Sequence, residues 1–357
     1  MFHPCHCTFV PPHITDNLAK RAPDDARAAA RATAIEAKSI RSRRAERWVS
    51  MDAMLSGSDD RSLGAALPAE GSGGREVWDS QQSWVQRVSL NRGEGDAATG
   101  DGDTDTVYDF AGDVRDFLSK DLSRNSIDNL GMKLILNVHY GVSYMNAFWD
   151  GDEMTFGDGD GSIFSGFARS LDVVAHELAH GVTQFTANLD YFSQSGALNE
   201  HFSDVFGTTV TQLANGESVD TADWLIGDEI MGPTLFGEAL RSMRTPGTAY
   251  DNPLMGTDPQ PAHMDDYFAG PEDNQGVHIN SGIPNRAFYL AATDIGDIAQ
   301  AGRIWYHGLQ NLWPTASFSD AAEVLVNAAR ELVKTGEAPK GAPQIVRAAF
   351  RAVGVTI

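Results

Sequence analysis

The stretch Asp172-Val173-Val174-Ala175-His176-Glu177-Leu178-Ala179-His180-Gly181-Val182-Thr183 contains two histidines four residues apart. On a helix, His176 and His180 lie one turn apart on the same face, so one nitrogen from each ring can reach a single ion. Glu177 lies beside them and can take a proton from a water held at that ion. The same pentad also arises by chance on helices, so a metal site requires a third ligand.

A third candidate ligand lies in the stretch Gly196-Ala197-Leu198-Asn199-Glu200-His201-Phe202-Ser203-Asp204. Hydrolytic zinc sites use three protein ligands and keep one open position, and Glu200 can complete that set. Asp204 lies one turn further on and would accept the other N–H of a ligating histidine. Alternatively, both carboxylates belong to the solvated side of a helix. Apolar neighbours indicate a buried helix, where unpaired carboxylates are costly, and so favour a metal site: Leu198, Phe202, Val205 and Phe206.

These stretches resemble the active-site region of the thermolysin-like zinc metallopeptidases, in which the glutamate ligand also stands twenty positions after the second histidine. Three further family signatures follow the family order: Asn146-Ala147-Phe148-Trp149, Gly157-Asp158-Gly159-Asp160-Gly161 and Gly276-Val277-His278-Ile279-Asn280-Ser281-Gly282. Thr186 stands where metzincins need a histidine, which excludes that group. The resemblance spans about residue 75 to the C-terminus. It implies an α+β fold of two lobes, one β-rich and one helical, with the zinc site in the cleft between them.

The resemblance also implies roles for individual residues. Zn²⁺ bound by His176, His180 and Glu200 would acidify a water and polarise the scissile carbonyl, with Glu177 as general base. Tyr191 and His278 match the positions that stabilise the oxyanion, and Asp273 matches the carboxylate that orients the histidine. Asn199 and Asp204 match groups behind the metal ligands. Four positions match groups that hold the substrate: Asn146, the Ala147 carbonyl, Trp149 and Arg241.

Six apolar residues match the lining of the pocket for the residue after the scissile bond: Phe164, Phe167, Val173, Ile226, Ile230 and Leu240. The same six residues could equally belong to the core. If they line a pocket, burial of a Leu or Phe side chain there contributes about 1.5–3 kcal/mol. We therefore expect cleavage on the N-terminal side of large hydrophobic residues.

The sequence matches the family's calcium ligands only in part. Asp172, Asp223 and Asp228 match ligands of the family's double calcium site, but Thr211 and Leu225 stand where the fuller site has acidic residues. Since Ca²⁺ is bound by several converging oxygens, we expect one structural Ca²⁺ at most in this region. The run from Asp101 to Asp105 also looks like a calcium loop. We favour the alternative that it is a turn capping the next helix.

Composition limits the classes of partner. The chain has 357 residues, 42% of them hydrophobic, and a formal net charge of −22. This charge argues against nucleic acid or an anionic membrane as partners, and no stretch approaches the roughly 18 apolar residues of a membrane span. We expect peptide and protein substrates, a monomer, and a proteinaceous inhibitor as a further candidate partner. Cys5 and Cys7 are two positions apart, so we expect no structural disulfide.

The N-terminus lacks the basic start and apolar run of a secretory signal. The sequence therefore favours a cytoplasmic protein or export by a leaderless route, with extracellular action still open. Pro11-Pro12-His13-Ile14, followed by the Ala/Arg-rich stretch 24–48, resembles the short propeptide of the protealysin-like branch of the family. The alternative is a disordered basic leader. We predict a propeptide over residues 1–55, a flexible processing linker over 56–75, a β-rich catalytic lobe over 76–187 that ends in the metal helix, and a helical lobe over 188–357.

A propeptide suggests two mechanisms of latency. Cys5 or Cys7 could ligate zinc as a thiolate, or the segment Pro11 to Ile14 could block the cleft by packing, which we favour.

Elsewhere the pattern of apolar residues predicts strands over 76–88, 133–140 and 154–157, helices over 107–121, 319–334 and 344–353, and an irregular loop over 250–276. Two other functions stay open: a catalytically inactive binding homologue, and a host-protein-binding or inhibitor-regulated factor whose proteolysis is secondary. Glu177→Gln would separate them from a peptidase.

Overall fold

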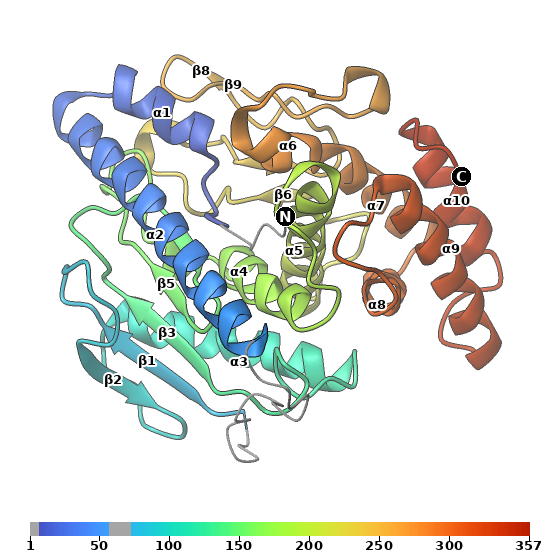
Figure 1. Ribbon diagram of the computed structural model, residues 1–357, viewed down its shortest axis with the longest axis horizontal. Coiled ribbons are helices and arrows are strands. Elements are labelled where there is room, and N and C mark those ends of the chain that lie inside the picture. The colour runs from blue at the N-terminus through green and yellow to red at the C-terminus, as the bar shows by residue number, and fades with distance from the viewer. Residues whose placement is uncertain (1–6, 57–72) are drawn as a thin grey trace.

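The computed structural model describes residues 7–56 and 73–357. Figure 1 shows strands gathered at the lower left, helices α7 to α10 at the right, and helices α4 and α5 between these two regions. The predicted α+β architecture with a β-rich N-terminal region and a helical C-terminal lobe is therefore confirmed. Most of the predicted processing linker, residues 57–72, lies outside the described residues.

Five short strands form one sheet: β1 (Arg75–Asp79), β2 (Ser89–Gly93), β3 (Leu134–Val138), β4 (Ala147–Trp149) and β5 (Met154–Phe156). Their order is β2-β1-β3-β5-β4, with β1, β3 and β5 parallel and the two edge strands antiparallel to their neighbours. Strands β3 and β5 lie where the sequence predicts them. The strand predicted over 76–88 ends earlier, because Gln81, Gln82 and Arg87 have positive φ and turn the backbone.

Helix α3 (Gly102–Lys120) packs against β1 and β3. The helix starts at Gly102 rather than at Val107, because the Asp101 carboxylate accepts a hydrogen bond of 2.7 Å from the backbone N–H of Thr104. This bond satisfies one of the free donors at the helix start. The acidic run therefore caps a helix, as we favoured over a calcium loop.

Helices α4 (Leu171–Gln184) and α5 (Ser193–Asn215) pack along each other at the centre of the molecule. Every residue of α4 from Leu171 to Thr183 is buried, so this helix is covered on all sides. Gly207 allows the close packing, since a Cβ atom there would lie 3.1 Å from the backbone oxygen of Asp172. The side chains that α4 presents are consequently held in fixed positions.

The C-terminal lobe contains α6 (Glu272–Asn280), α7 (Gly282–Ile295), α8 (Ile298–Leu309), α9 (Phe318–Thr335) and α10 (Ala342–Ala352). The short helix η1 (Phe167–Arg169) lies between β5 and α4. Between α5 and α6 the chain forms six short elements: β6 (Leu225–Ile226), η2 (Pro233–Leu235), β7 (Arg241–Ser242), β8 (Asp251–Asn252), β9 (Gly256–Thr257) and η3 (Met264–Asp266). Helices α9 and α10 confirm the predicted helices. Helix α9 begins one residue before the predicted start at 319, and Ser317 caps it through a reciprocal capping box with Asp320.

The predicted loop over 250–276 is partly wrong. Its last residues belong to α6, in which Asp273 to Gly276 have φ values between 51° and 76°. This left-handed turn places the Asp273 carboxylate at the backbone N–H of His278, at 2.8 Å. A pattern of Pro, Asp and Gly did not distinguish such a turn from an irregular loop.

Two N-terminal helices lie across both lobes (Figure 1). Helix α1 (Pro12–Arg21) reaches the C-terminal lobe, where His13 Nε2 lies 2.8 Å from the Tyr250 hydroxyl and Asn17 donates to the Met255 carbonyl at 2.6 Å. Helix α2 (Asp24–Ser56) reaches the β-rich lobe, where Thr33 accepts from the backbone N–H of Met145 at 3.0 Å. The Ala/Arg-rich stretch 24–48 is helical as part of α2.

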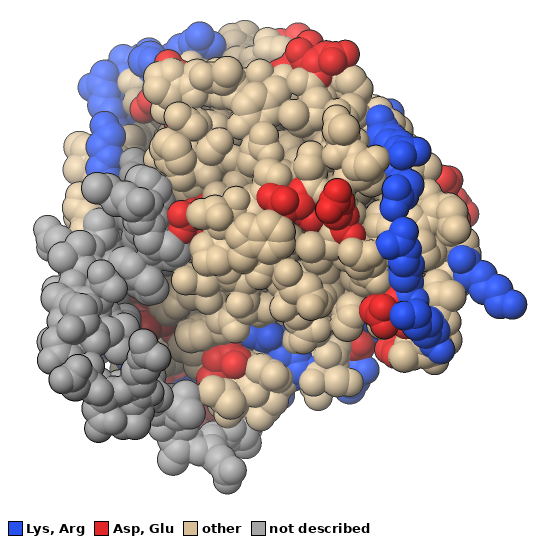
Figure 2. Space-filling view, turned by 45° about the vertical axis from the view of Figure 1, so that its right-hand side comes forward, with Lys and Arg blue, Asp and Glu red and all other residues tan. Residues whose placement is uncertain are grey.

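Figure 2 shows a face on which uncharged residues dominate and acidic residues form several separate small groups. On this face the acidic side chains are thus divided among separate groups rather than concentrated in one patch. Within the described ranges, no helix combines the length and apolar character that crossing a membrane requires.

Candidate active site and metal centre

Helices α4 and α5 bring the three predicted zinc ligands together. The Nε2 atoms of His176 and His180 lie 3.1 Å apart, and oxygens of Glu200 lie 3.6 Å and 3.5 Å from them. Ligands about 2.0–2.1 Å from a tetrahedral ion are separated from one another by roughly 3.3 Å. All three residues are buried, and Glu200 Oε2 has no hydrogen-bond partner among the described residues. The donor set therefore fits one Zn²⁺.

The second nitrogen of each histidine is held by a polar partner. His176 Nδ1 lies 2.8 Å from Asp204 Oδ1, and His180 Nδ1 lies 2.8 Å from Asn199 Oδ1. These contacts turn both Nε2 atoms toward Glu200. Both Asp204 and Asn199 thus lie where the sequence predicts groups behind the ligands.

Glu177 is fully buried beside this set, and neither of its carboxylate oxygens has a partner at standard hydrogen-bond geometry. Burial raises the pKa of Glu177 to about 7, although the charge of His176 and the backbone amide of Trp149 act in the opposite direction. A carboxylate with a pKa near neutrality can both accept and return a proton.

Tyr191 and His278 face the same centre from the opposite side. The Tyr191 hydroxyl donates to Glu200 and lies 3.2 Å from His278 Nε2. Burial and the charge of Glu200 raise the pKa of Tyr191 well above its ordinary value, so the hydroxyl keeps its proton. Burial lowers the pKa of His278, but the charges of Asp273 and Glu200 outweigh this effect and raise it to about 9. Asp273 lies 2.6 Å from His278 Nδ1, so Nε2 is directed at the cleft as a donor.

The predicted substrate-holding groups divide into two sets. Arg241 on β7 and Asn146 and Ala147 at the start of β4 border the cleft and contact the N-terminal segment. Trp149 instead donates from its indole to Gln184 at 2.9 Å and is 1% exposed, so its side chain supports α4 from the core.

The N-terminal segment lies in this cleft. The Thr8 carbonyl is 3.1 Å from His278 Nε2, and the Phe9 carbonyl accepts from Arg241 at 3.3 Å. The Phe9 ring is fully buried, with its centroid 5.0 Å from that of the His176 ring. The backbone of Val10 pairs with the side-chain amide of Asn146. The hydrogen bonds to the cleft come from residues 8–10, and α1 begins directly after them at Pro12. Pro11 and Ile14, in the segment that we favoured as the block, are both buried.

The six predicted pocket residues are all buried in the main hydrophobic core, which extends over both lobes and also includes Phe9: Phe164, Phe167, Val173, Ile226, Ile230 and Leu240. Leu240 has the clearest relation to the cleft. A Cβ atom added at Gly227 would lie 3.1 Å from both Leu240 and the Phe9 ring.

Asp172, Asp223 and Asp228 line a separate cavity of about 100 Å³, together with Glu217 and Glu229. Burial, with the charges of Asp172 and Asp223, raises the pKa of Asp228 to about 7. The three aspartates do not form a cluster within 4.8 Å, whereas elsewhere in the described residues Asp103, His139 and Asp158 do. A cation in the cavity would have to draw the carboxylates closer together.

The cysteine prediction is wrong, since Cys7 is disulfide-bonded. The other cysteine, Cys5, lies outside the described residues. Cys7 packs with Tyr191 and Val277, and its sulfur lies within 4.8 Å of ligand atoms of His180 and Glu200. In this state the sulfur is not a thiolate, so the structure does not use the thiolate mechanism of latency.

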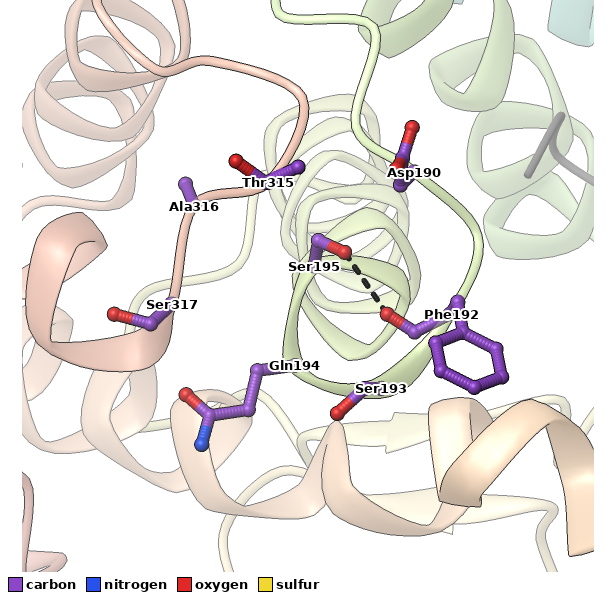
Figure 3. A pocket seen from close by; sticks show the side chains of 8 residues that line it. All are labelled: Asp190, Phe192, Ser193, Gln194, Ser195, Thr315, Ala316 and Ser317. Atoms are coloured by element: carbon purple, nitrogen blue, oxygen red, sulfur yellow. Dashed lines mark hydrogen bonds between the residues drawn. The ribbon is translucent and has the colours of Figure 1, made fainter. Parts of the chain in front are cut away.

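Another cavity, of about 380 Å³, lies where the start of α5 meets the segment before α9. Figure 3 shows its lining, in which Ser195 donates to the Phe192 carbonyl. None of the predicted site residues is among the residues that line it.

Sequence reasoning missed several polar neighbours of the site. Asn285 on α7 donates to Asp204 Oδ2 at 2.8 Å, and Gln260 donates to the His278 carbonyl at 2.7 Å. No local pattern marks either residue, because each contact joins distant parts of the chain. Glu229 beside Asp228 could have been found from the local density of acidic residues.

Two histidines and a glutamate at zinc-ligand spacing, in a cleft between a β-rich and a helical lobe, define a zinc metallopeptidase. Residues 69–184 match the model described as the thermolysin metallopeptidase catalytic domain, and residues 187–355 match the thermolysin metallopeptidase alpha-helical domain. The chain belongs to the thermolysin metallopeptidase family and is a metalloendopeptidase of that type.

Three similar proteins illustrate the relationship. An extracellular metalloprotease of Pectobacterium carotovorum subsp. carotovorum is 46% identical over 305 residues, which cover 85% of this chain and 84% of the relative. A thermolysin of Alicyclobacillus acidocaldarius subsp. acidocaldarius is 40% identical over 257 residues, or 69% of this chain and 44% of the relative. The solved precursor of protealysin, a metalloproteinase from Serratia proteamaculans, is 40% identical with a TM-score of 0.85, over 98% of this chain and 100% of that chain.

Proposed function

We propose that this protein is a zinc-dependent neutral endopeptidase that cleaves on the N-terminal side of large hydrophobic residues. We further propose that it is made as a precursor inhibited by its own N-terminal segment. The observation that carries the proposal is the Glu177 carboxylate, which is buried without a standard hydrogen-bond partner beside three residues at zinc-ligand spacing. An unpaired buried carboxylate is costly to keep, and a catalytic role accounts for it.

His176, His180 and Glu200 would hold the zinc ion, which when bound would acidify a water and polarise the scissile carbonyl. Glu177 would accept a proton from the attacking water and deliver it to the leaving nitrogen, a double role that suits its pKa of about 7. Asp273 keeps His278 Nε2 directed at the cleft, where His278 and Tyr191 would donate to the negative oxygen that develops.

The preference for large hydrophobic residues rests on the buried Phe9 ring, which lies with Leu240 against Gly227. A Phe or Leu side chain moved from water into such surroundings contributes about 1.5–3 kcal/mol. Arg241 and Asn146 would hold the substrate backbone on either side of this pocket, as they hold the N-terminal segment.

Inhibition by the N-terminal segment rests on its two anchors. Helix α1 is bonded to the C-terminal lobe and α2 to the β-rich lobe. These two anchors fix the chain that directly follows residues 8–10, which are bonded to the cleft. The solved precursor of protealysin, which matches 98% of this chain, supports a propeptide of this kind. We place the propeptide at residues 1–55 and its removal within the linker 56–75, and N-terminal sequencing of the mature enzyme would identify the cut.

One Ca²⁺ is proposed for the cavity lined by Asp172, Asp223 and Asp228. Carboxylates that raise one another's pKa repel, and a divalent cation relieves this repulsion. We also propose a monomer that acts outside the cell, in keeping with the name of the Pectobacterium relative, and size-exclusion chromatography of the culture medium would test both points. Regulation by a proteinaceous inhibitor remains a prediction from the sequence.

The deciding experiment compares the wild type with Glu177→Gln for zinc content and for cleavage of a peptide that contains one Phe. Full zinc in both proteins, with turnover only in the wild type after removal of the N-terminal segment, is the expected result. Turnover in neither protein would instead favour a binding role. Absence of zinc from the wild type would refute the metal centre.

A further inference from the structure

His201 on α5 is a buried polar residue that the zinc chemistry does not use. It stands next to the predicted ligand Glu200, yet both nitrogens of its ring are bonded elsewhere. Nδ1 lies 2.7 Å from Oδ1 of Asn285 on α7, and Nε2 accepts a hydrogen bond of 2.8 Å from the indole of Trp305 on α8. Neither nitrogen is therefore free to bind the ion, and any role of this histidine acts through its two partners.

Trp305 determines where the proton of His201 lies. The indole N–H is a donor and cannot accept, so Nε2 of His201 has to present its lone pair. The ring is then neutral, with its one proton on Nδ1, which donates to Asn285 Oδ1. The indole is itself fixed, because it is fully buried and its ring centroid lies 4.8 Å from that of Phe288 and 6.2 Å from that of Phe350.

Asn285 carries this direction on to Asp204. Because its oxygen faces His201, its amide nitrogen faces Asp204 and donates to Oδ2 at 2.8 Å. A flipped amide would turn its oxygen to the carboxylate and its N–H groups to the His201 proton, and both hydrogen bonds would be lost. The requirement at Asp204 agrees with the one at Trp305, since an ionised carboxylate only accepts. One arrangement of protons therefore satisfies all four side chains.

The Asp204 carboxylate uses all of its acceptor sites. Oδ2 accepts from Arg241 Nε at 2.9 Å and from Asn285 Nδ2 at 2.8 Å. Oδ1 accepts from Arg241 Nη2 at 2.8 Å and lies 2.8 Å from His176 Nδ1. A carboxylate offers about four acceptor positions, so the group cannot rotate without breaking one of these bonds. This fixed orientation directs Nε2 of His176 toward the metal centre.

We propose that Trp305, His201 and Asn285 are positioning residues of the metal centre. Their hydrogen bonds run in one direction, from the indole on α8 to the carboxylate on α5, and hold Asp204 in the orientation that presents His176 to zinc. The inference rests on the proposed zinc site and deepens it. It means that α7 and α8, which pack against α5 and carry none of the predicted ligands, contribute to zinc affinity.

The test uses the full-length chain in a Glu177→Gln background, which excludes self-cleavage. His201→Phe removes both ring nitrogens and keeps an aromatic ring. His201→Asn keeps one donor, because the amide nitrogen of Asn is as far along the side chain from Cβ as Nδ1 is and can still reach Asn285. Thr209→Val is the matched control. Thr209 is also buried on α5 beside α8, but its hydroxyl donates to the Val205 carbonyl of its own helix.

The first measurement is zinc affinity, by competition with a chelator, together with the unfolding temperature of the zinc-free chain. His201→Phe should weaken zinc binding about tenfold, the lower end of the effect of groups behind metal ligands, because the loss acts through Asp204. His201→Asn should restore most of this affinity, although it leaves the Trp305 N–H unpaired and so lowers the unfolding temperature. Thr209→Val should lower the unfolding temperature and leave zinc affinity unchanged.

A combined variant tests whether the residues act as one series. Asn285→Leu removes the bond to Asp204 directly and should weaken zinc binding at least as much as His201→Phe. His201→Phe together with Asn285→Leu should be no weaker than Asn285→Leu alone, because both changes remove the same support. Additive losses would show that His201 acts on zinc by a separate route and would overturn the series.

The second measurement does not depend on zinc. Nitrogen NMR of the zinc-free chain, labelled at histidine, reports which ring nitrogen carries the proton, and the signal missing from His201→Phe identifies His201. We expect the proton of His201 on Nδ1. A proton on Nε2 would overturn the proposal whatever the zinc affinities are.

Unchanged zinc affinity in His201→Phe would also overturn the proposal, as would equally weak binding in His201→Phe and His201→Asn. Failure of the zinc site itself looks different. The wild type then binds no zinc while His201 still carries its proton on Nδ1, and the proposal falls because there is no affinity for the three residues to set.

Discussion

Asp204 forms a two-point ion pair with Arg241 in the interior, with Nε to Oδ2 at 2.9 Å and Nη2 to Oδ1 at 2.8 Å. The same carboxylate lies 2.8 Å from His176 Nδ1. Burial alone would raise the pKa of Asp204, but the charge of Arg241 and the bond to His176 outweigh it and hold that pKa well below its ordinary value. One carboxylate thus supports both a predicted zinc ligand and the arginine that contacts the Phe9 carbonyl.

Replacing Asp204 with Asn should therefore damage two properties together. Zinc affinity should fall about 10- to 100-fold, because the His176 ring loses the charge that orients it. The free energy of unfolding should fall by about 3–5 kcal/mol, because Arg241 is left as an unpaired buried charge. Zinc titration and thermal unfolding measure the two effects. Asp116→Asn is the control, since its pair with Lys120 is on the surface and contributes little. Unchanged zinc affinity in Asp204→Asn would contradict the orienting role.

His278→Gln should lower kcat about 10²- to 10³-fold with little change in KM or zinc content, because a donor to the developing oxyanion is lost. Asp273→Asn should produce a smaller loss of the same kind, since it only orients His278. Steady-state kinetics of the processed enzyme measure both. His263→Gln is the matched control, because His263 caps the short helix η3 and faces no catalytic residue. Loss of zinc together with kcat in His278→Gln would assign His278 a structural role instead.

The docking of α1 should weaken as the pH falls. Burial lowers the pKa of His13 to about 4, against an ordinary value of 6.5, and its Nδ1 has no hydrogen-bond partner among the described residues. The released helix therefore binds more protons than the docked one between pH 6.5 and 4. Docking is at full strength above pH 6.5 and should weaken by up to about tenfold for each pH unit below it.

Amide exchange across α1 in the Glu177→Gln chain, corrected for the pH dependence of free amides, measures this change. His13→Gln cannot titrate, so its docking should vary much less between pH 7 and pH 5. The control His263→Gln should keep the wild-type pH dependence of docking, because the His263 side chain is 38% exposed. An identical slope in all three chains would show that another group governs the release.

The sequence was sufficient to predict which side chains of α4 and α5 lie together in the candidate metal centre, because the relevant geometry is local to helices. His176, Glu177 and His180 lie on one turn of α4, and Glu200 and Asp204 are one turn apart on α5. Helical periodicity fixes which of these side chains share a face. Strands β3 and β5 and helices α9 and α10 were predictable for the same reason, since each combines a clear apolar period with a turn signal.

The remaining contacts depend on tertiary packing, which no local pattern records. Asn285 reaches Asp204 from 81 positions away, and Thr8 reaches His278 from 270 positions away. The sequence predicted a blocking segment at Pro11 to Ile14, but it did not mark residues 8–10, which make the hydrogen bonds with the cleft directly before α1 begins at Pro12. The disulfide of Cys7 was missed because the prediction rested only on the short spacing of the cysteines in the sequence.

The last prediction concerns the cavity lined by Asp172, Asp223, Asp228, Glu217 and Glu229, where Thr211 and Leu225 are also part of the lining. We expect the wild type to bind one Ca²⁺ there, and removal of calcium by a chelator should lower the unfolding temperature. At a free calcium concentration 100 times the Kd, binding contributes about 2.7 kcal/mol.

Thr211→Glu combined with Leu225→Glu adds two carboxylates to the same cavity, enough to balance a second divalent ion. Calorimetric titration should therefore show a stoichiometry that rises from one toward two. Leu213→Glu, on the exposed part of α5 and outside this lining, should leave the stoichiometry at one. Two ions bound by the wild type would show that Glu217 and Glu229 already replace the missing acids, and no binding by any variant would remove calcium from this cavity.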